Sequence, residues 1–537
     1  MMRLTLLLLS SIQFCWVLSQ PVYERIYSGG AAGKFNLIEL NSGNVLTIVV
    51  NSFSINITGT SISNNDGVII HSHAYYIDTF VVMQSIKKYT ENEFYFVGGY
   101  WKDTCSTTGA KKTYPVIGRM DSIGNILSIH HYALNAPECS NMAGDLDILS
   151  GEGGAIAWGT RDYRFFALKV DAAGEPVWAK RFSHQAAFQF IKELPGGDLL
   201  AGINMDTAGA VVARMDANGN FLWCKSYIRP RGMLHDALIE SDDAFIITGY
   251  TDSTASTNPF IPLPTTFQPK LFMMKLDGAG EVQWSRGYDS APNYWYTGQS
   301  SRIVKALDGN YVVLATLGHP GYNFFLRPFL MKTDLNGDTL WTRSGGASGY
   351  DYFTKDLLAH SDGGYLISGG VWGDLPEMNT GLPYIFKTDS LGHFSCLERQ
   401  HPVQVLDLFP TDSNFVLTSI DGATVHPAFV NDTIFDPINV YDACVVTSVQ
   451  QYRPTKLRAM RVYPNPTLGR FTVEFADPLM AESYYSVYDA MGRLLYQRPL
   501  PTGATLEEVD LSRFGRGTYV LRVTDPEGQR HTRVVVE

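Results

Sequence analysis

Six aspartates recur at equivalent positions along this chain and have the most obvious capacity for chemistry. Each follows a lysine or arginine by two residues and precedes a glycine by three. They are Asp121, Asp171, Asp216, Asp277, Asp334 and Asp389. Carboxylates can bind metal ions or transfer protons. However, Asp-x-x-Gly between apolar strands is typical of a hairpin turn, in which Asp bonds its own backbone and Gly adopts a positive φ. We therefore expect these aspartates to hold turns.

The basic residue before each aspartate lies on the same face of its strand, because side chains in a strand repeat with a period of two. We expect each to form an ion pair with the aspartate of its own repeat, an interaction worth about 0–1 kcal/mol when exposed. These residues are Arg119, Lys169, Arg214, Lys275, Lys332 and Lys387.

Two histidine pairs are candidate metal ligands. His71 and His73 lie on one face of a predicted strand, a spacing that could bind a metal ion, whereas His130 and His131 point to opposite faces. No cysteine or carboxylate cluster stands beside either pair, and the sequence has no Gly-x-Ser-x-Gly, His-Glu-x-x-His or phosphate-binding loop. The sequence thus predicts no catalytic residue, no metal site and no cofactor, and it argues against an enzyme.

Aromatic residues in long connecting segments are the remaining candidates for recognition. They are Tyr294, Trp295, Tyr296, Tyr350 and Tyr352. Aromatic rings in loops can stack on sugar rings or grip a protein partner. The alternative is that they only cover the edges of the sheets.

The elements that position these residues form a repeat, because successive aspartates of the set lie roughly 45–60 residues apart. Each repeat contains about four short apolar strands. A single sheet of this size cannot bury both faces, whereas sheets stacked around an axis can, as in a β-propeller. We predict an all-β fold with a seven-bladed β-propeller over residues 20–449, and eight blades as the alternative.

Seven units run from Lys34 to Glu398, and residues 412–417 look like part of an eighth. Residues 22–27 form a stray strand that we expect to pair with strands from the far end of the domain. In four repeats a tryptophan stands seven residues after the aspartate, and its large ring is expected to fill the gap between neighbouring blades. These residues are Trp178, Trp223, Trp284 and Trp341.

The N-terminus has the pattern of a secretory signal peptide. Arg3 precedes an apolar core that ends at the small residue Ser19, so we expect cleavage after Ser19 or one residue later. No later stretch is apolar enough for a transmembrane helix. The net charge of −11 is spread along the chain, which argues against nucleic acid or an anionic membrane as a partner.

Export would leave five cysteines in an oxidising compartment, so at least one is unpaired. Cys105 and Cys139 fall within one repeat and form the first candidate disulfide, and Cys396 and Cys444 form the second. The alternative is that none of these pair. Cys224 follows an expected core residue and is predicted to be a buried thiol.

After a linker over residues 450–461, the segment 462–537 consists of short alternating strands typical of a small Ig-like β-sandwich. Its motifs occur in the order Tyr-Pro-Asn-Pro, Gly-x-Phe-x-Val, Val-Tyr-Asp-x-x-Gly-Arg-Leu-Leu, Asp-Leu-Ser and Gly-x-Tyr-x-Leu-Arg-Val. This ordered set strongly resembles the type A C-terminal sorting domain of the type IX secretion system. The motif residues include Tyr463, Pro464, Asn465, Pro466, Gly469, Asp489, Gly492, Gly517 and Tyr519.

The resemblance implies passage across the inner membrane by the signal peptide and across the outer membrane by the sorting domain. It also implies the type IX machinery and its sortase-like peptidase as partners, and a secreted or cell-surface location. The repeats resemble propeller repeats of exported Bacteroidota proteins. They depart from quinoprotein and sialidase repeats in the Asp-to-Gly spacing, so no functional residue is carried over from those families.

The first hypothesis is a binding module that recognises a glycan or a protein through one propeller face. The alternatives are a polysaccharide hydrolase or lyase with carboxylates in the central funnel, since paired carboxylates leave no linear motif, and a structural protein of the cell envelope.

Overall fold

The computed structural model divides the chain into two compact units, Met1–Val445 and Val446–Glu537. It describes residues 22–27, 36–50, 58–76, 81–104, 111–134, 142–151, 153–161, 164–205, 209–229, 232–251, 269–290, 295–319, 325–347, 350–373, 381–395, 398–408, 411–414, 417, 419–421, 423–427, 431–434, 440–442, 460–475, 479, 483–489, 494–525 and 528–537. None of the helical structure within these ranges is long and apolar enough to cross a membrane.

Unit 1 consists of antiparallel sheets built from consecutive strands. The β2 sheet contains β2 (Leu37–Glu39), β3 (Val45–Val50), β4 (Thr58–Ser63) and β5 (Ile69–Tyr76). The β6 sheet contains β6 (Val81–Lys88), β7 (Glu93–Thr104), β8 (Lys111–Asp121) and β9 (Ile126–Leu134). A nine-stranded sheet follows, with β10 (Met142–Ile148), β11 (Ala155–Arg161), β12 (Arg164–Val170), β13 (Pro176–Glu193), β14 (Leu199–Met205), β15 (Gly209–Met215) and β16 (Phe221–Arg229).

Three further sheets complete the series. The β17 sheet contains β17 (Gly232–Ser241), β18 (Ala244–Thr251), β19 (Lys270–Asp277) and β20 (Val282–Asp289). The β21 sheet contains β21 (Trp295–Lys305), β22 (Tyr311–His319), β23 (Phe325–Thr333) and β24 (Thr339–Ser344). The β25 sheet contains β25 (Tyr350–Ala359), β26 (Tyr365–Gly373), β27 (Leu382–Thr388) and β1 (Tyr23–Tyr27).

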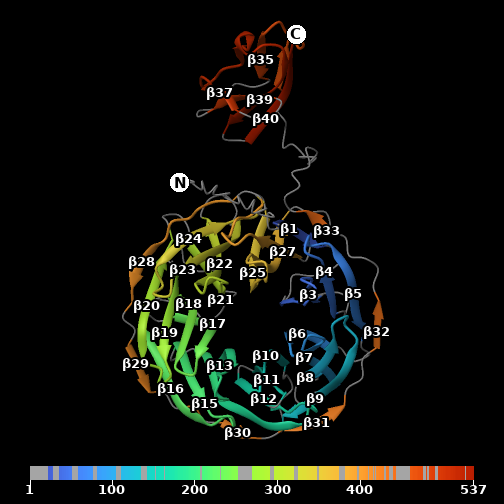
Figure 1. Ribbon diagram of the computed structural model, residues 1–537, viewed down its shortest axis with the longest axis vertical. Helices are drawn as coiled ribbons and strands as arrows, with labels where there is room; N and C mark the ends of the chain where they lie inside the picture. Colours follow the sequence, from blue (N-terminus) through green and yellow to red (C-terminus); the bar gives the residue numbers. More distant parts are fainter. Residues whose placement is uncertain are drawn as a thin grey trace, which may run out of the picture. The chain divides into compact units, whose positions relative to one another are not determined.

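The sheets follow one another around a centre in sequence order, with the first strand of each innermost (Figure 1). Hydrophobic clusters lie between neighbouring sheets; Val212 of β15 and Phe272 of β19, for example, belong to one buried cluster. The expected pairing of the N-terminal segment with the far end is confirmed, because β1 pairs with β27. The prediction of an all-β fold is also confirmed for the described residues.

All six aspartates hold turns, as predicted; five of these turns join the third and fourth strands of a sheet, and the turn of Asp389 follows β27. In each turn one carboxylate oxygen accepts the N–H groups two and four residues later, as Asp216 does from Asn218 at 2.9 Å and Asn220 at 2.8 Å. The glycine of this turn, Gly219, has a φ of 74°, a value that favours glycine. In the first sheet Asn64 takes the place of the aspartate. We call these segments the Asp turns.

The repeated tryptophans join neighbouring sheets. The indole N–H of Trp223, in β16, donates to the carbonyl of Gly278 at 2.9 Å, in the Asp turn that follows β19 of the next sheet. A Cβ on Gly280 would lie 2.8 Å from the Trp223 ring, so only glycine allows this close approach. A repeated tyrosine, which the sequence analysis missed, acts beside it: Tyr227, for example, donates its hydroxyl hydrogen to the carbonyl of Gly280 at 2.6 Å.

We predicted that each basic residue pairs with the aspartate two positions later. This prediction is wrong for the basic residues whose ion pairs the structure describes. Arg214 pairs at 2.8 Å with Asp198, which lies in the turn between β13 and β14, and Lys332 pairs at 2.8 Å with Asp308 in the turn between β21 and β22. The reason is that the repeat aspartates are occupied by backbone N–H groups. The basic side chains extend instead to the neighbouring turn at the same end of the sheet.

Six short strands follow β27 and pair with the outer edges of the sheets (Figure 1). They are β28 (Gln404–Asp407), β29 (Thr411–Asn414), β30 (Ser419–Asp421), β31 (Ala423–Pro427), β32 (Asn431–Ile434) and β33 (Val440–Asp442). The segment that we expected to begin an eighth unit, residues 412–417, therefore does not form a sheet of its own in the described structure. Its strand β29 pairs with β16.

Unit 2 has two antiparallel sheets around one hydrophobic cluster that includes Phe471, Val487, Val509 and Leu521. One sheet contains β34 (Met460–Tyr463), β35 (Arg470–Phe475) and β38 (Leu506–Asp510). The other contains β37 (Leu494–Pro499), β36 (Tyr484–Tyr488), β39 (Gly517–Asp525) and β40 (Gly528–Val536). A short 3-10 helix, η1, spans Ser512–Phe514.

Candidate functional site

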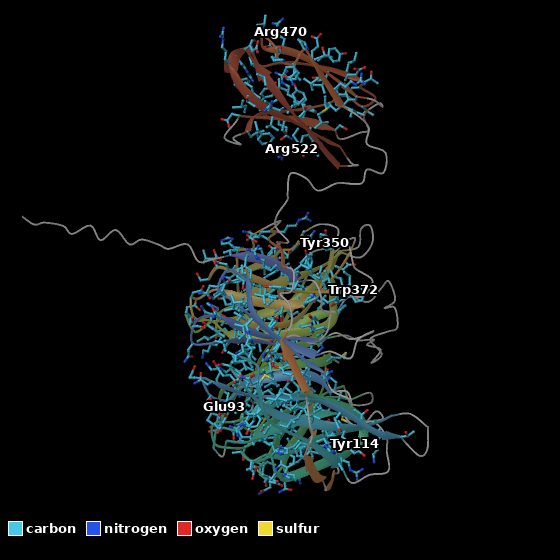
Figure 2. The ribbon with its side chains drawn as sticks, turned by 90° about the vertical axis from the view of Figure 1, so that its right-hand side faces the viewer. Glu93, Tyr114, Tyr350, Trp372, Arg470 and Arg522 are labelled. Atoms are coloured by element: carbon cyan, nitrogen blue, oxygen red, sulfur yellow. The ribbon has the colours of Figure 1, made fainter. Side chains whose placement is uncertain are left out.

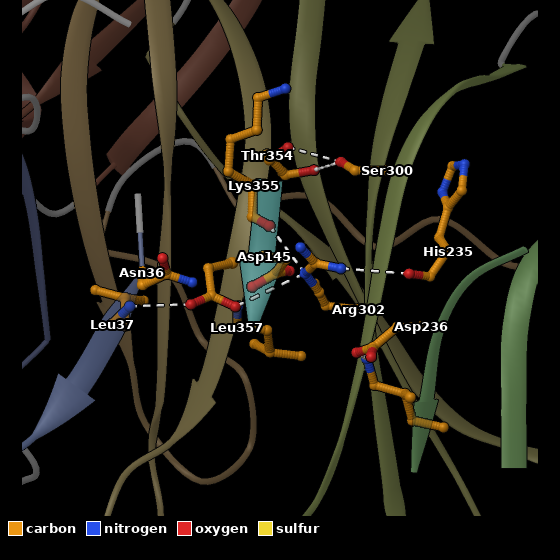
Figure 3. Close-up of polar contacts among 12 residues, drawn as sticks. Asn36, Leu37, Asp145, His235, Asp236, Ser300, Arg302, Thr354, Lys355 and Leu357 are labelled. Carbon is orange, nitrogen blue, oxygen red and sulfur yellow. Dashed lines mark hydrogen bonds and ion pairs between the residues drawn. The ribbon is translucent and has the colours of Figure 1, made fainter. Parts of the chain in front are cut away.

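The innermost strands of unit 1 bring charged residues together at the centre. Register irregularities interrupt the first strands, for example between Leu234 and Asp236 in β17 and between Thr354 and Asp356 in β25. Such bulges re-aim the side chains that follow them. The charged residues of this central cluster are Lys87, Asp145, Asp147, Lys192, Asp236, Arg302 and Asp356. Figure 3 shows part of the cluster around Arg302.

The carboxylates of this cluster connect each innermost strand to the next sheet. Asp236 accepts the N–H of its neighbour Ala237 at 2.9 Å and that of Ile303, in the next sheet, at 3.2 Å. Asp356 accepts the N–H of Leu357 at 3.0 Å and that of Leu37 at 2.9 Å. An innermost strand is an edge strand, so the N–H groups on its inner side have no neighbouring strand to accept their hydrogen bonds. The aspartate side chains accept these hydrogen bonds instead.

Three more side chains bind in the same manner. Asn36 accepts the N–H of Ile86 at 3.2 Å through its side-chain oxygen. Asp147 accepts the N–H of Glu193 at 3.2 Å, and Asp145 accepts the hydroxyl hydrogen of Ser85. Side chains at one innermost strand thus repeatedly hold the next strand around the centre.

The cations of the cluster lie between the carboxylates. Lys192 is 2.8 Å from Asp236, and Nε of Arg302 is 3.8 Å from Asp356. Arg302 also donates to the carbonyl oxygens of Lys355 at 3.1 Å and His235 at 3.4 Å. The arginine is therefore held by both ion pairing and backbone acceptors.

The cluster shifts the pKa values of its carboxyls in opposite directions. Burial raises the pKa of Asp356 and of Asp147, in spite of nearby cations. Burial also opposes the ionisation of Asp236, but the charges of Lys192 and Arg302 outweigh it and lower the pKa of that carboxyl. Burial lowers the pKa of His235 to about 3, so this ring is neutral. Within the described ranges no three His, Cys, Asp or Glu side chains are grouped for metal binding.

The aromatic residues proposed from sequence as binding residues differ in how deeply they are buried. Tyr296 and Tyr352 are fully buried, in β21 and β25, so their rings pack in the core. Tyr350 is half-buried at the start of β25. Tyr294 and the side chain of Trp295 lie outside the described residues. Sequence reasoning missed Trp372 in β26, which is 40% exposed.

The other predicted residues have mixed outcomes. Cys224 is a buried free thiol, as predicted, and burial raises its pKa to about 12. The candidate disulfide cysteines lie outside the described residues; they are Cys105, Cys139, Cys396 and Cys444. The rings of His71 and His73 lie 4.8 Å apart, and Nε2 of His71 is 3.0 Å from the carbonyl oxygen of Ile123 in the neighbouring sheet.

Several motif residues of unit 2 stabilise its fold. The Asn465 side chain donates to the carbonyl of Arg533 at 2.7 Å and accepts the N–H of Val535 at 2.8 Å, which ties the Tyr-Pro-Asn-Pro segment to β40. Gly469 has a φ of 114° and lies against Ser512, and the hydroxyl of Tyr519 donates to the carbonyl of Phe514 at 2.8 Å.

The remaining motif residues of unit 2 differ in their exposure to solvent. Tyr463 is exposed, Asp489 is half-buried and Gly517 is exposed. Pro464 and Pro466 flank Asn465, and Gly492 lies outside the described residues.

Comparison with protein families matches residues 461–537 to the family described as "Secretion system C-terminal sorting domain". A search of curated proteins finds no significant match to the chain. The matched segment coincides with the folded sandwich of unit 2, and it confirms the resemblance that its motifs indicated. The protein is therefore exported by type IX secretion, to the cell surface or beyond.

Proposed function

We propose that unit 1 is a seven-bladed β-propeller that binds a glycan or a protein at the cell surface, through the end of its sheets that carries the long connections. The observation that carries this proposal is the difference between the two ends of the sheets, together with the use of the central carboxylates in backbone hydrogen bonds.

The strand order supports seven blades. The 18-residue strand β13 pairs with β12 through its first half and with β14 through its second half. The nine-stranded sheet then counts as two blades that share this strand. With the β2, β6, β17, β21 and β25 sheets, this gives seven groups of four strands, the last completed by β1.

The two ends of the sheets differ in what connects the strands. Tight turns, including the Asp turns, join first to second and third to fourth strands at the turn end. Connections between second and third strands and between sheets leave from the opposite, loop end, and the connection between β18 and β19 spans residues 252–269. Figure 2 shows Glu93 at the turn end and Tyr114, Tyr350 and Trp372 at the loop end. Binding residues concentrate on loops that a rigid scaffold positions.

Aromatic side chains at the loop end support recognition of a sugar or an apolar protein segment. Trp372 exposes 40% of its surface, although an indole of this size gains free energy when it is covered. Tyr350, at the start of β25, is half-buried and lies at the same end (Figure 2). Stacked aromatic contacts are worth about 0.5–1.5 kcal/mol each beyond buried area.

A second candidate function is hydrolysis or cleavage of a polysaccharide in the centre. It is favoured by one observation: Arg302 lies between Asp236, whose pKa is lowered, and Asp356, whose pKa is raised. Carboxyls with separated pKa values suit an acid and a base. The backbone hydrogen bonds of both carboxylates favour a structural role instead.

The test is a screen of the full secreted protein for binding to a glycan array and to surface proteins, with polysaccharide turnover measured in parallel. We expect binding without turnover. Trp372→Ala should weaken binding by about 2- to 12-fold, the loss of one stacked ring, whereas Leu335→Ala, at an exposed residue of the turn end, should not. Turnover that is lost in Asp356→Asn would favour the enzyme. Neither binding nor turnover would leave a structural role in the envelope.

A further inference from the structure

The segment that follows β27 runs backwards around unit 1. Arg399 forms a bridge with Ser344 of β24, and β28 then pairs with β20, β29 with β16, β30 with β13, β31 with β9, β32 with β5 and β33 with β1. Every sheet of unit 1 except the β21 sheet, which has only the Arg399 bridge, thus gains an outer strand, and the paired strands are met in the reverse of their sequence order (Figure 1). We call the described residues between 399 and 442 the belt.

The reversal has a local cause. In the other sheets the chain continues from the Asp turn into a fourth strand, but in the β25 sheet that place beside β27 is taken by β1. After the last Asp turn the chain therefore has no partner strand in its own sheet. Phe394 is buried beside β27, and the backbone of Arg399 then exchanges two hydrogen bonds of 2.9 Å with Ser344 in the preceding sheet.

Side chains anchor the first part of the belt. His401 is buried, with Nε2 at 2.6 Å from the hydroxyl of Ser344. Leu408 covers Gly287 of β20, where a Cβ would lie 3.1 Å from the leucine, and its N–H donates to the carbonyl of Ser285 at 3.0 Å. Further along, Asp412 pairs with Lys225 at 3.3 Å. These contacts are specific to particular sheets, so the belt has a fixed register.

Without the belt, the outer strands would be free edges. They include β5 and β20, with eight residues each, and β9 and β16, with nine. Exposed edges of this length are templates for pairing with other chains, whereas short edge strands resist it. The belt strands have three to five residues. The outer edges of the sheets together form the rim of unit 1. The belt therefore replaces long exposed edge strands on this rim with short ones.

We infer that the outer rim of unit 1 is a strand-acceptor surface and that the belt is its built-in occupant, which prevents the rim from accepting the belt of a second copy of this chain. The segment acts as a donor strand, of the kind that adds to an open sheet edge through backbone hydrogen bonds. Its removal from the rim would let two copies exchange belts.

The test uses the full chain and a labelled synthetic peptide of residues 398–414. The double variant Arg399→Pro, Leu408→Pro removes the two N–H groups that donate hydrogen bonds to the carbonyls of Ser344 and Ser285 on the rim. The double variant Arg399→Ala, Leu408→Ala keeps both N–H groups. We expect the proline variant to bind the peptide at least about tenfold more tightly than the alanine variant does. Its uncovered outer strands should also pair with those of a second copy, which would give dimers or larger species that excess peptide suppresses. A folded proline variant that stays monomeric and binds no peptide would overturn the inference.

Hydrogen exchange of the unmodified protein gives a second measurement, which does not depend on how the proline variant folds. The amides of Arg399 and Leu408 should be protected, and the belt should open before the inner strands of the same sheets. Exchange of these two amides at the rate of an unstructured peptide would refute the role of the belt.

Discussion

Replacement of Asp236 by alanine tests whether the central cluster holds the sheets together. The change leaves the N–H groups of Ala237 and Ile303 without their acceptor and removes the partner that lies 2.8 Å from Lys192. A buried donor that loses its partner costs about 1–3 kcal/mol, and a broken buried ion pair about 3–5 kcal/mol. The Lys192 side chain is 30% exposed, which reduces its share. We therefore expect a loss of about 4 kcal/mol in the free energy of unfolding.

Asp236→Asn should cost less, about 1–2 kcal/mol, because the amide keeps one acceptor oxygen and the same shape. The matched control is Asp289→Ala. Asp289 forms a partly exposed ion pair with Lys270 at 2.8 Å and should cost less than about 1 kcal/mol. Denaturant unfolding of the full chain, followed by tryptophan fluorescence, measures all three. If Asp236→Ala unfolds within about 0.5 kcal/mol of the unmodified protein, the cluster does not hold the sheets and the reasoning is refuted.

Three further predictions concern single residues. Gly219→Ala should lower stability by more than Gly197→Ala does, as measured by thermal unfolding. Both glycines have a positive φ, and the backbone strain of an alanine there costs about 1 kcal/mol or more. Only at Gly219 would the new Cβ also meet a neighbour within 4 Å. From about pH 3 to pH 7, the stability that Asp236 contributes should appear as the pH rises, because its folded pKa is below 3.8, and that of Asp356 should fall, because its folded pKa is above 3.8. The difference between the unmodified protein and each asparagine variant should therefore change with opposite slopes, and parallel slopes would contradict the assigned shifts. Cys224, with a pKa of about 12, should resist a thiol reagent at about pH 8 until the protein unfolds, and rapid labelling of the folded protein would contradict its burial.

The turns and the sorting domain could be predicted from sequence because their residue types repeat or form ordered motifs. Asp216 and Gly219 recur at a fixed spacing since each turn has the same backbone requirement, and Trp178 recurs since its indole donates to the following Asp turn, as that of Trp223 also does. Asn465 and Tyr519 belong to a motif that the family match also covers.

The central cluster could not be predicted in this way. Asp145, Asp236, Arg302 and Asp356 occupy innermost strands, but their residue types vary from sheet to sheet. The register irregularities before them also interrupt the alternation that assigns a side chain to a face. The belt escaped prediction for a different reason: its strands are short, and their partners lie far away in the sequence, so they leave no local pattern.

The pairing of β33 with β1 has a topological consequence. Arg25 lies opposite Asp442 in this antiparallel pair. The N-terminal end of the first described strand of unit 1 therefore lies beside the C-terminal end of the last one. A short peptide link between these ends would make the unit a covalently closed chain with no fixed beginning. That chain could then be opened at a connection of the loop end to give a circular permutant with the same strand pairs. The point at which the chain begins is thus separable from the order of the sheets around the centre.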